Sequence, residues 1–391
     1  MIASASERPA HHLPALDGLR GLAATAVVIA HALDAVAMPL PLRSLLVESP
    51  LALIFNGSPA VQIFFVLSGF VLAASLERGR ALIDLAQFYV KRVFRIHPPY
   101  VFGVLAAWGA SFLFVPFRKG VGLTDWLRQA TQTHLEAGDL LASFAFPGSA
   151  RGQLMVGWTL QIEMVFSLLL PLLVAGARPA RGLPLLAASA LLLLLPDERG
   201  GLPLGVLWYA IEFSFGVVAY RERRAIGAWL RGLPRWARVA CVAAALGFLC
   251  APFVLRWSVP IANVIAGGFY PRDIAVMSVG AFGLVAATAS LPALERFFAA
   301  DLCRFLGRIS YSVYLLHLPV IGLLAPRMVR PGVVESWVVF VGAVLGVTIA
   351  VSMAFHRAIE RPSIALGNRL CRRLARRFGA RYLVSRAVEG P

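Results

Sequence analysis

The chain has 391 residues, of which 59% are hydrophobic and 15% are charged, and its mean hydropathy is +0.75. A composition this apolar excludes an ordinary water-soluble domain and predicts a protein that crosses a membrane several times. The formal net charge of +17 does not indicate nucleic-acid binding, because the basic residues lie in short segments that border apolar runs.

The apolar stretches that could cross a hydrocarbon layer of about 30 Å recur along the whole chain. They fall near residues 20–38, 52–76, 98–116, 155–176, 183–196, 202–220, 238–256, 272–290, 310–325 and 336–356. We therefore predict an all-α fold, a polytopic membrane helix bundle of about ten transmembrane helices within residues 1–360. The fifth span is short and is bounded by Pro184 and Pro196.

The distribution of Lys and Arg predicts the orientation of the bundle. Most of these residues fall on the cytoplasmic side if the N-terminus is inside, which favours N-in and C-in by the positive-inside rule. The tail at 361–391 spaces Leu370, Leu374, Phe378 and Tyr382 four residues apart between arginines. This pattern predicts a basic amphipathic cytoplasmic helix on anionic lipid, with a solvated basic tail as the alternative.

The first span carries two ionisable side chains, Arg20 and His31. Eleven residues at about 100° each bring both to within roughly 20° of one helix face, about 16.5 Å apart along the axis. An ionisable side chain inside a membrane is costly and usually functional, although a histidine that only hydrogen-bonds a neighbouring helix is the alternative. Asp34, one turn beyond His31, could orient the ring.

A basic cluster precedes the third predicted span. Lys91, Arg92 and Arg95 come just before Pro98 and Pro99, where we expect that span to begin. Arg92 and Arg95 are three residues apart and hence neighbours on a helix, and paired guanidinium groups suit phosphate oxygens. A positive-inside anchor accounts for the charge equally well.

Polar side chains also occur inside other spans. In the second span, Ser68 and the glycine that follows it allow close helix approach. Glu163 lies among apolar residues of the fourth span, and a carboxylate there needs an arginine or a substrate hydroxyl as partner. The ninth span carries Tyr311, Tyr314 and His317, for which packing and function are equally good explanations.

Taken together and in this order, five separated segments resemble the acyltransferase 3 family of membrane O-acyltransferases, over nearly the full chain. These are LDGLRGLAATAVVIAH with its Arg-x10-His spacing, FFVLSGF at 64–70, RVFRIHPPY at 92–100, WTLQIE at 158–163, and LGRISYSVYLLHLPV at 306–320 with ERP at 360–362. The family acylates surface polysaccharides and related acceptors.

The resemblance implies that an acyl-CoA, usually acetyl-CoA, is bound from the cytoplasm and that its acyl group reaches a hydroxyl on the outer side of a bacterial inner membrane. It implies a donor site made of Arg92, Arg95, Arg20 and Lys91. His31 would act as general base or transient acyl carrier, with Arg20 and Glu163 as further catalytic candidates. The substrate-binding candidates are Tyr311, Tyr314, His317, Ser68 and Asp34. No metal is expected, and the oligomeric state is left open.

Two features depart from the family pattern, and two other functions compete. Phe166 is followed by Ser167, where many relatives have a second aromatic residue, and no SGNH esterase-like domain is appended. The segment 117–154, with Trp126, His134 and Asp139, is the candidate for acceptor contact. A proton-coupled transporter would also explain buried His31 and Glu163, and a scaffold for glycan assembly is a further possibility.

Overall fold

The structure is a computed structural model that describes residues 13–76, 82–114, 122–131, 140–141, 143–144, 156–177, 182–195, 204–255 and 271–388. Over these ranges the chain is helical, with one isolated β-bridge between Val36 and Leu123. The predicted all-α class is therefore confirmed for the described part of the chain, and most of the candidate acceptor segment 117–154 lies outside it.

The helices of the first half are α1 (Pro14–Asp34), α2 (Leu40–Val47), α3 (Ala52–Phe55), α4 (Gly57–Leu76), α5 (Leu82–Ser111), α6 (Asp125–Thr131) and α8 (Gly157–Gly176). Those of the second half are α9 (Gly182–Leu191), η1 (Leu192–Leu194), η2 (Leu204–Tyr209), α10 (Ala210–Arg221), α11 (Arg223–Gly232), α12 (Arg235–Val254), α13 (Pro271–Thr288), α14 (Pro292–Phe298), α15 (Asp301–Met328), α16 (Val334–Phe355), η3 (His356–Glu360) and α17 (Arg361–Val388).

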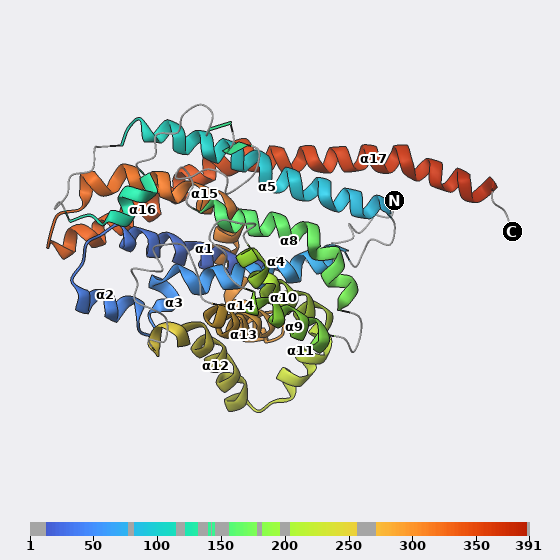
Figure 1. Ribbon diagram of the computed structural model, residues 1–391, viewed down its shortest axis with the longest axis horizontal. Helices are drawn as coiled ribbons and strands as arrows, with labels where there is room; N and C mark the ends of the chain where they lie inside the picture. The colour runs from blue at the N-terminus through green and yellow to red at the C-terminus, as the bar shows by residue number, and fades with distance from the viewer. Residues whose placement is uncertain are drawn as a thin grey trace, which may run out of the picture.

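The long helices α1, α4, α5, α8, α15 and α16 lie roughly along one direction, and α10 to α14 pack beside them (Figure 1). Six described segments are long and apolar enough to cross a membrane: Pro14–Asp34, Gly57–Leu76, Gly157–Gly176, Arg235–Val254, Asp301–Met328 and the continuous run Val334–Arg376. The pair α13 and α14, bent by 92° at its break, would make a seventh if it crosses as one span.

The predicted total of ten spans stays a prediction. The predicted stretches 183–196 and 202–220 contain only the short α9 with η1 and the short α10 with η2. Large apolar side chains nevertheless face outward, as lipid contact requires: Leu172 is 70% exposed on α8 and Val338 is 68% exposed on α16. The chain is thus built as a membrane protein with several apolar helices.

α1 and α15 run parallel and touch backbone to backbone. A Cβ added at Gly21 would lie 2.4 Å from the amide nitrogen of Gly307, and a Cβ at Gly307 would lie 2.2 Å from the carbonyl oxygen of Asp17. Only glycine permits so close an approach between helices. The contact fixes the register of the two helices and brings His31 level with His317.

A second glycine contact joins α4 to α10. A Cβ at Gly69 would lie 2.3 Å from the carbonyl oxygen of Phe213, and one at Gly216 would lie 2.2 Å from that of Val66. The prediction of a close helix approach is confirmed for Gly69, whereas Ser68 lines a cavity described below.

The third predicted span does not begin at the two prolines. Pro98 and Pro99 lie inside α5, which starts at Leu82 and so carries the basic cluster on the same helix. A proline in a helix removes the hydrogen bond to the carbonyl four residues earlier. The carbonyl of Phe94, which Pro98 leaves without its usual partner, accepts a hydrogen bond from the Ser363 hydroxyl instead, and α5 continues.

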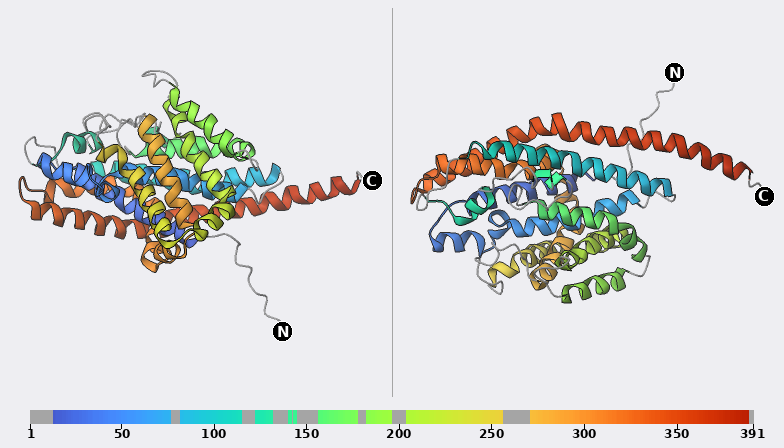
Figure 2. Two further views of the ribbon diagram at one scale, coloured as in Figure 1. Left: turned by 90° about the horizontal axis from the view of Figure 1, so that it is seen from below. Right: turned by 45° about the horizontal axis from the view of Figure 1, so that its top comes forward.

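The tail from residue 361 is not a separate helix on the surface. α17 continues α16 through the π-helical turn η3, and its Cys371 thiol lies 3.5 Å from the carbonyl oxygen of Gln87 on α5. Figures 1 and 2 show α17 lying against α5 and then extending beyond the bundle. The predicted boundary at 360 therefore falls within one long helix, and lipid contact by the last residues remains a prediction.

The chain direction gives the bundle two distinct ends, which we name the Pro14 end and the Asp34 end after the ends of α1. α15 is parallel to α1, and α16 returns antiparallel after the turn at 329–333. The start of α1 and the start of α17 consequently lie at the same end of the bundle, the Pro14 end (Figure 1).

We expect Gly21→Val to destabilise the protein by about 1–3 kcal/mol, because the backbone of α15 blocks the new side chain. Thermal unfolding in detergent measures the effect, and Gly346→Val is the matched control, since a Cβ there meets nothing within 4 Å. Equal melting temperatures for the two variants would contradict the close helix contact.

Candidate functional site

A cavity of about 560 Å³ lies between α1, α4, α5, α8 and α15. It extends from Ser75, Asp84 and Gln87, toward the Pro14 end, to Val61 and Thr159, nearer the Asp34 end. Of the predicted site residues, those that line it are Arg20, Ser68, Lys91, Arg92, Arg95, Glu163, Tyr311 and Tyr314. Segments far apart in the sequence therefore build one cavity.

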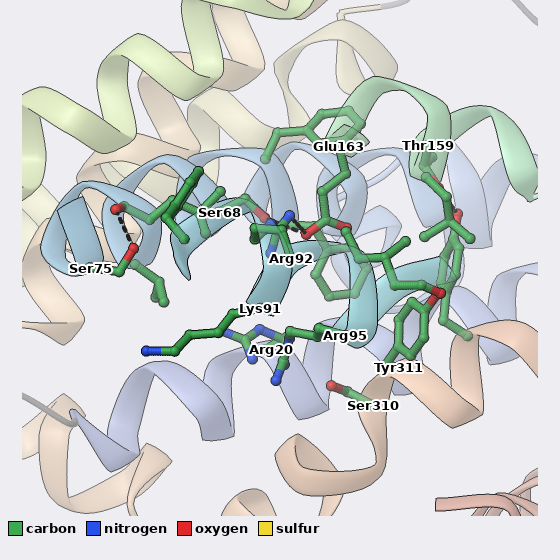
Figure 3. A pocket seen from close by; sticks show the side chains of 18 of the residues that line it. Arg20, Ser68, Ser75, Lys91, Arg92, Arg95, Thr159, Glu163, Ser310 and Tyr311 are labelled. Atoms are coloured by element: carbon green, nitrogen blue, oxygen red, sulfur yellow. Dashed lines mark hydrogen bonds and ion pairs between the residues drawn. The ribbon is translucent and has the colours of Figure 1, made fainter. Parts of the chain in front are cut away.

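Three cationic side chains gather on one side of this cavity. Figure 3 shows Arg20, Lys91 and Arg95 together, across from Ser68 and Glu163. Arg20 lies 3.4 Å from Asp17 on its own helix. Lys91 and Arg95 are exposed, and neither has an ion-pair partner among the residues that the structure describes. The cavity thus presents unneutralised positive charge.

Arg92 is used differently from its neighbour Arg95. It is only 8% exposed, its Nη2 donates to Oε1 of Glu163 at 2.8 Å, and its Nε donates to Oγ of Ser167 at 2.9 Å. Ser167 in turn donates to the carbonyl of Glu163 at 2.6 Å. The structure therefore pairs Arg92 with a carboxylate on α8, whereas the sequence paired it with Arg95 as a phosphate ligand.

This network answers two questions that the sequence left open. Glu163 has an arginine as its partner, and Ser68 also reaches its Oε1, at 3.4 Å. Ser167, noted only as a departure from the aromatic pattern, accepts a hydrogen bond from Arg92. Sequence reasoning missed Ser167 because the residue that it bonds to lies on α5, 75 positions earlier in the chain.

Two tyrosines tie α15 to its neighbours around the cavity. The Tyr311 hydroxyl donates to the carbonyl of Ile96 at 2.8 Å, next to the prolines of α5. The Tyr314 hydroxyl lies 2.7 Å from Oγ1 of Thr159 on α8, and the Phe64 ring meets the Tyr314 ring edge-on. We call the hydrogen bond between Tyr314 and Thr159 the crossbar.

His31 and His317 do not line the cavity; they lie beyond the crossbar, toward the Asp34 end. His317 is one turn beyond Tyr314 on α15, about 4.5 Å along the axis, and its side chain is fully buried. Nδ1 of His31 is 2.8 Å from Nε2 of His317, and the Trp126 ring centre lies 5.2 Å from that of His31. Tyr314 thus lines the cavity, whereas His31 does not.

Asp34 does not hold the His31 ring, so this pairing is wrong. Its Oδ1 accepts a hydrogen bond from Nη2 of Arg43 at 2.9 Å, while Nδ1 of His31 lies 2.8 Å from Nε2 of His317. His317, a predicted substrate-binding residue, does not line the cavity, because its ring is buried against His31 and its own helix. Spacing along α1 could not reveal a partner on α15.

The ion pair between buried Arg92 and half-buried Glu163 makes a specific prediction about stability. We expect Arg92→Leu to destabilise the protein by about 3 kcal/mol, since it leaves Glu163 without its counter-charge. The double variant Arg92→Leu with Glu163→Leu should recover most of that loss, whereas Ser167→Ala should cost about 1 kcal/mol. Thermal unfolding measures all three, and a double variant less stable than Arg92→Leu would contradict the pairing.

Comparisons with known proteins give one family match and several relatives that cover most of the chain. A family model described as an acyltransferase domain matches residues 13–357. The acyltransferase MdmB of Streptomyces mycarofaciens is 28% identical over 388 residues, covering 90% of this chain and 92% of MdmB. The exopolysaccharide production protein ExoZ of Rhizobium meliloti is 28% identical over 351 residues, covering 85% of this chain and 95% of ExoZ.

A third relative, the O-acetyltransferase PaAT-1 of Phomopsis amygdali, is 25% identical over 393 residues, which cover 82% of this chain and 74% of PaAT-1. No solved structure matches the chain. The similarity to the named transferases thus extends across the helices that build the cavity.

Proposed function

Because this chain belongs to the acyltransferase 3 family, we propose that it is an integral membrane O-acyltransferase that moves an acetyl group from acetyl-CoA to a hydroxyl of a glycan or glycosylated acceptor. The observation that carries the proposal is a cavity in which Lys91 and Arg95 have no ion-pair partner among the described residues, and which is separated by the crossbar from a histidine pair. The site is made of Arg20, Lys91 and Arg95 on one side and His31 on the other.

The cationic side of the cavity suits the phosphates of a CoA thioester. Phosphate oxygens bind guanidinium and ammonium groups through charge-assisted hydrogen bonds, and Arg95 and Lys91 are available for them. Arg92 instead holds Glu163 in place and supports the site indirectly. We place the Pro14 end, and hence the cationic side, at the cytoplasm of a bacterium, in keeping with the positive-inside rule.

The chemistry proposed for His31 is general base catalysis. Its ring takes the proton of the acceptor hydroxyl while the hydroxyl oxygen attacks the thioester carbonyl carbon. The carbon–sulfur bond then breaks, and the CoA thiolate takes the proton back from the imidazole. The products are the acyl ester and free CoA, and for the thioester to reach His31 the Tyr314 ring must turn away from Thr159.

The acceptor is proposed to approach from the Asp34 end, beside Trp126 and His31. A planar aromatic ring next to the base suits the apolar face of a sugar. ExoZ, whose name refers to exopolysaccharide production, is similar over nearly its whole length, which supports a glycan acceptor.

Purified protein in lipid nanodiscs, given acetyl-CoA labelled in the acetyl group, tests the proposal. We expect free CoA and labelled ester to appear in equal amounts when membrane glycans from the native host are added. Glycan masses from deletion and wild-type cells should differ by one acetyl increment per site, which identifies the acceptor.

Two outcomes would overturn the proposal. Solute uptake into vesicles that depends on a proton gradient, with no release of CoA, would point to a transporter. Full glycan acetylation in cells that carry only His31→Ala protein would point to a scaffold for a separate enzyme.

A further inference from the structure

The two histidines beyond the crossbar meet edge to edge rather than face to face. Nδ1 of His31 and Nε2 of His317 are 2.8 Å apart, whereas the ring centres are 5.1 Å apart and the ring planes differ by 11°. The two nitrogens are thus the nearest parts of two nearly coplanar rings. This is the geometry of one in-plane hydrogen bond between them.

The backbone of α15 decides which way that hydrogen bond runs. Nδ1 of His317 lies 2.8 Å from the carbonyl oxygen of Tyr314 and 3.3 Å from that of Val313. A carbonyl oxygen only accepts, so Nδ1 of His317 carries the proton. A neutral imidazole has one donor and one acceptor nitrogen, which leaves Nε2 of His317 as the acceptor.

The bond therefore fixes the tautomer of His31. Since Nε2 of His317 accepts, Nδ1 of His31 must donate, and the lone pair of the neutral His31 ring is on Nε2. That nitrogen is not the one that bonds to His317, and the centre of the Trp126 ring lies 5.2 Å from the centre of the His31 ring. No carboxylate bonds to either ring within the described parts of the chain, so the carbonyls of α15 take the place that an acid holds in many histidine pairs.

We propose that His317 is a positioning residue that holds His31 in the tautomer whose Nε2 accepts the proton of the acceptor hydroxyl. This inference rests on the proposed function. We call the hydrogen-bonded chain from Nδ1–H of His31 through His317 to the carbonyls of α15 the relay. When Nε2 of His31 takes the proton, Nδ1–H of His31 continues to donate to His317, so the relay needs no rearrangement. When the leaving thiolate takes that proton, the pair returns to its starting state.

The relay depends on the register of the two helices. His31 and His317 are in reach because the glycine contact at Gly21 and Gly307 sets α1 directly against α15. Full burial of His317 and its two carbonyl contacts keep its ring from turning over. The orientation of the base is thus set by backbone atoms.

Two substitutions of His317 distinguish the effect of losing the acceptor nitrogen from the effect of changing the size of the side chain. His317→Leu removes the acceptor, and we expect kcat to fall about 100-fold while the dissociation constant for acetyl-CoA changes less than twofold, because His317 does not line the donor cavity. His317→Gln can offer a side-chain oxygen to Nδ1–H of His31. We expect the kcat of His317→Gln to be about tenfold higher than that of His317→Leu.

The tautomer itself can be measured in the unaltered protein. Solid-state 15N spectra of histidine-labelled protein in lipid, with His31→Gln used to identify the His31 signals, should show a protonated Nδ1 and a bare Nε2. In His317→Leu the same signals should change to those of a mixture of tautomers. This measurement needs no activity and applies even if His317→Leu folds poorly.

The outcomes distinguish the inference from the function that it rests on. Wild-type His31 with its proton on Nε2, or an unchanged kcat in folded His317→Leu, would overturn the relay while leaving acyl transfer intact. Full activity of His31→Ala would overturn the proposed function itself, whatever the tautomer.

Discussion

Replacing His31 with alanine is expected to lower the kcat of acyl transfer by about 10²–10⁴-fold, the range that general base catalysis contributes. The dissociation constant for acetyl-CoA should stay within about twofold of wild type, because His31 does not line the donor cavity. Transfer of labelled acetyl groups in nanodiscs gives kcat, and equilibrium binding gives the affinity.

The matched control for this variant is Thr25→Val on the same helix. The Thr25 hydroxyl donates to the carbonyl of Gly21, within α1, and the residue does not line the cavity. Both variants remove a polar group from α1, so equal loss of activity would mean that damage to the helix, and not loss of the base, explains the result. A His31→Ala variant with wild-type kcat would exclude the ring from the chemistry.

Replacing Arg95 with alanine is expected to weaken acetyl-CoA binding by about 10- to 100-fold, the equivalent of one charge-assisted hydrogen bond of roughly 1.5–3 kcal/mol. Arg95→Glu should weaken it further, and rising salt should reduce the difference between variants. Acetyl-pantetheine, which lacks the nucleotide phosphates, should bind wild type and Arg95→Ala alike. Calorimetry in detergent measures each affinity.

Arg330→Ala provides the matched control, because Arg330 is exposed just beyond the end of α15, at the Asp34 end of the bundle. Its loss should leave acetyl-CoA affinity unchanged. If Arg95→Ala weakened acetyl-pantetheine as much as acetyl-CoA, Arg95 would contact the thioester arm or shape the cavity and would not bind phosphate.

The helical class and the family could be predicted from the sequence, because both depend on local composition and on the order of short motifs along the chain. The sequence also identified Arg95 and Tyr311, which line the cavity. It could not show that Arg92 and Arg95, neighbours on one helix, have different partners, because the choice is made by Glu163 and Ser167 on α8. Helical spacing identifies a face but not what packs against it.

The wrong predictions have the same physical origin. Pro98 and Pro99 normally mark a helix boundary, yet α5 continues through them, and a hydroxyl from α17 donates to the carbonyl that Pro98 leaves without its usual partner. Asp34 lies one turn from His31, but Arg43 holds it, and the true partner His317 is 286 positions away. In both cases the structure depends on contacts between segments that are distant in the sequence, and such contacts cannot be inferred from local sequence patterns.

The crossbar between Tyr314 and Thr159 bears on whether ions could leak through the helix bundle. A bacterial membrane stores its energy as an ion gradient, and a lasting aqueous pore through this bundle would discharge it. On the proposed function, the Tyr314 ring, which is hydrogen-bonded to Thr159, would block the passage of water and ions whenever no thioester occupies the cavity. If the protein acts across such a membrane as proposed, its helix bundle would stay closed to ions between turnovers.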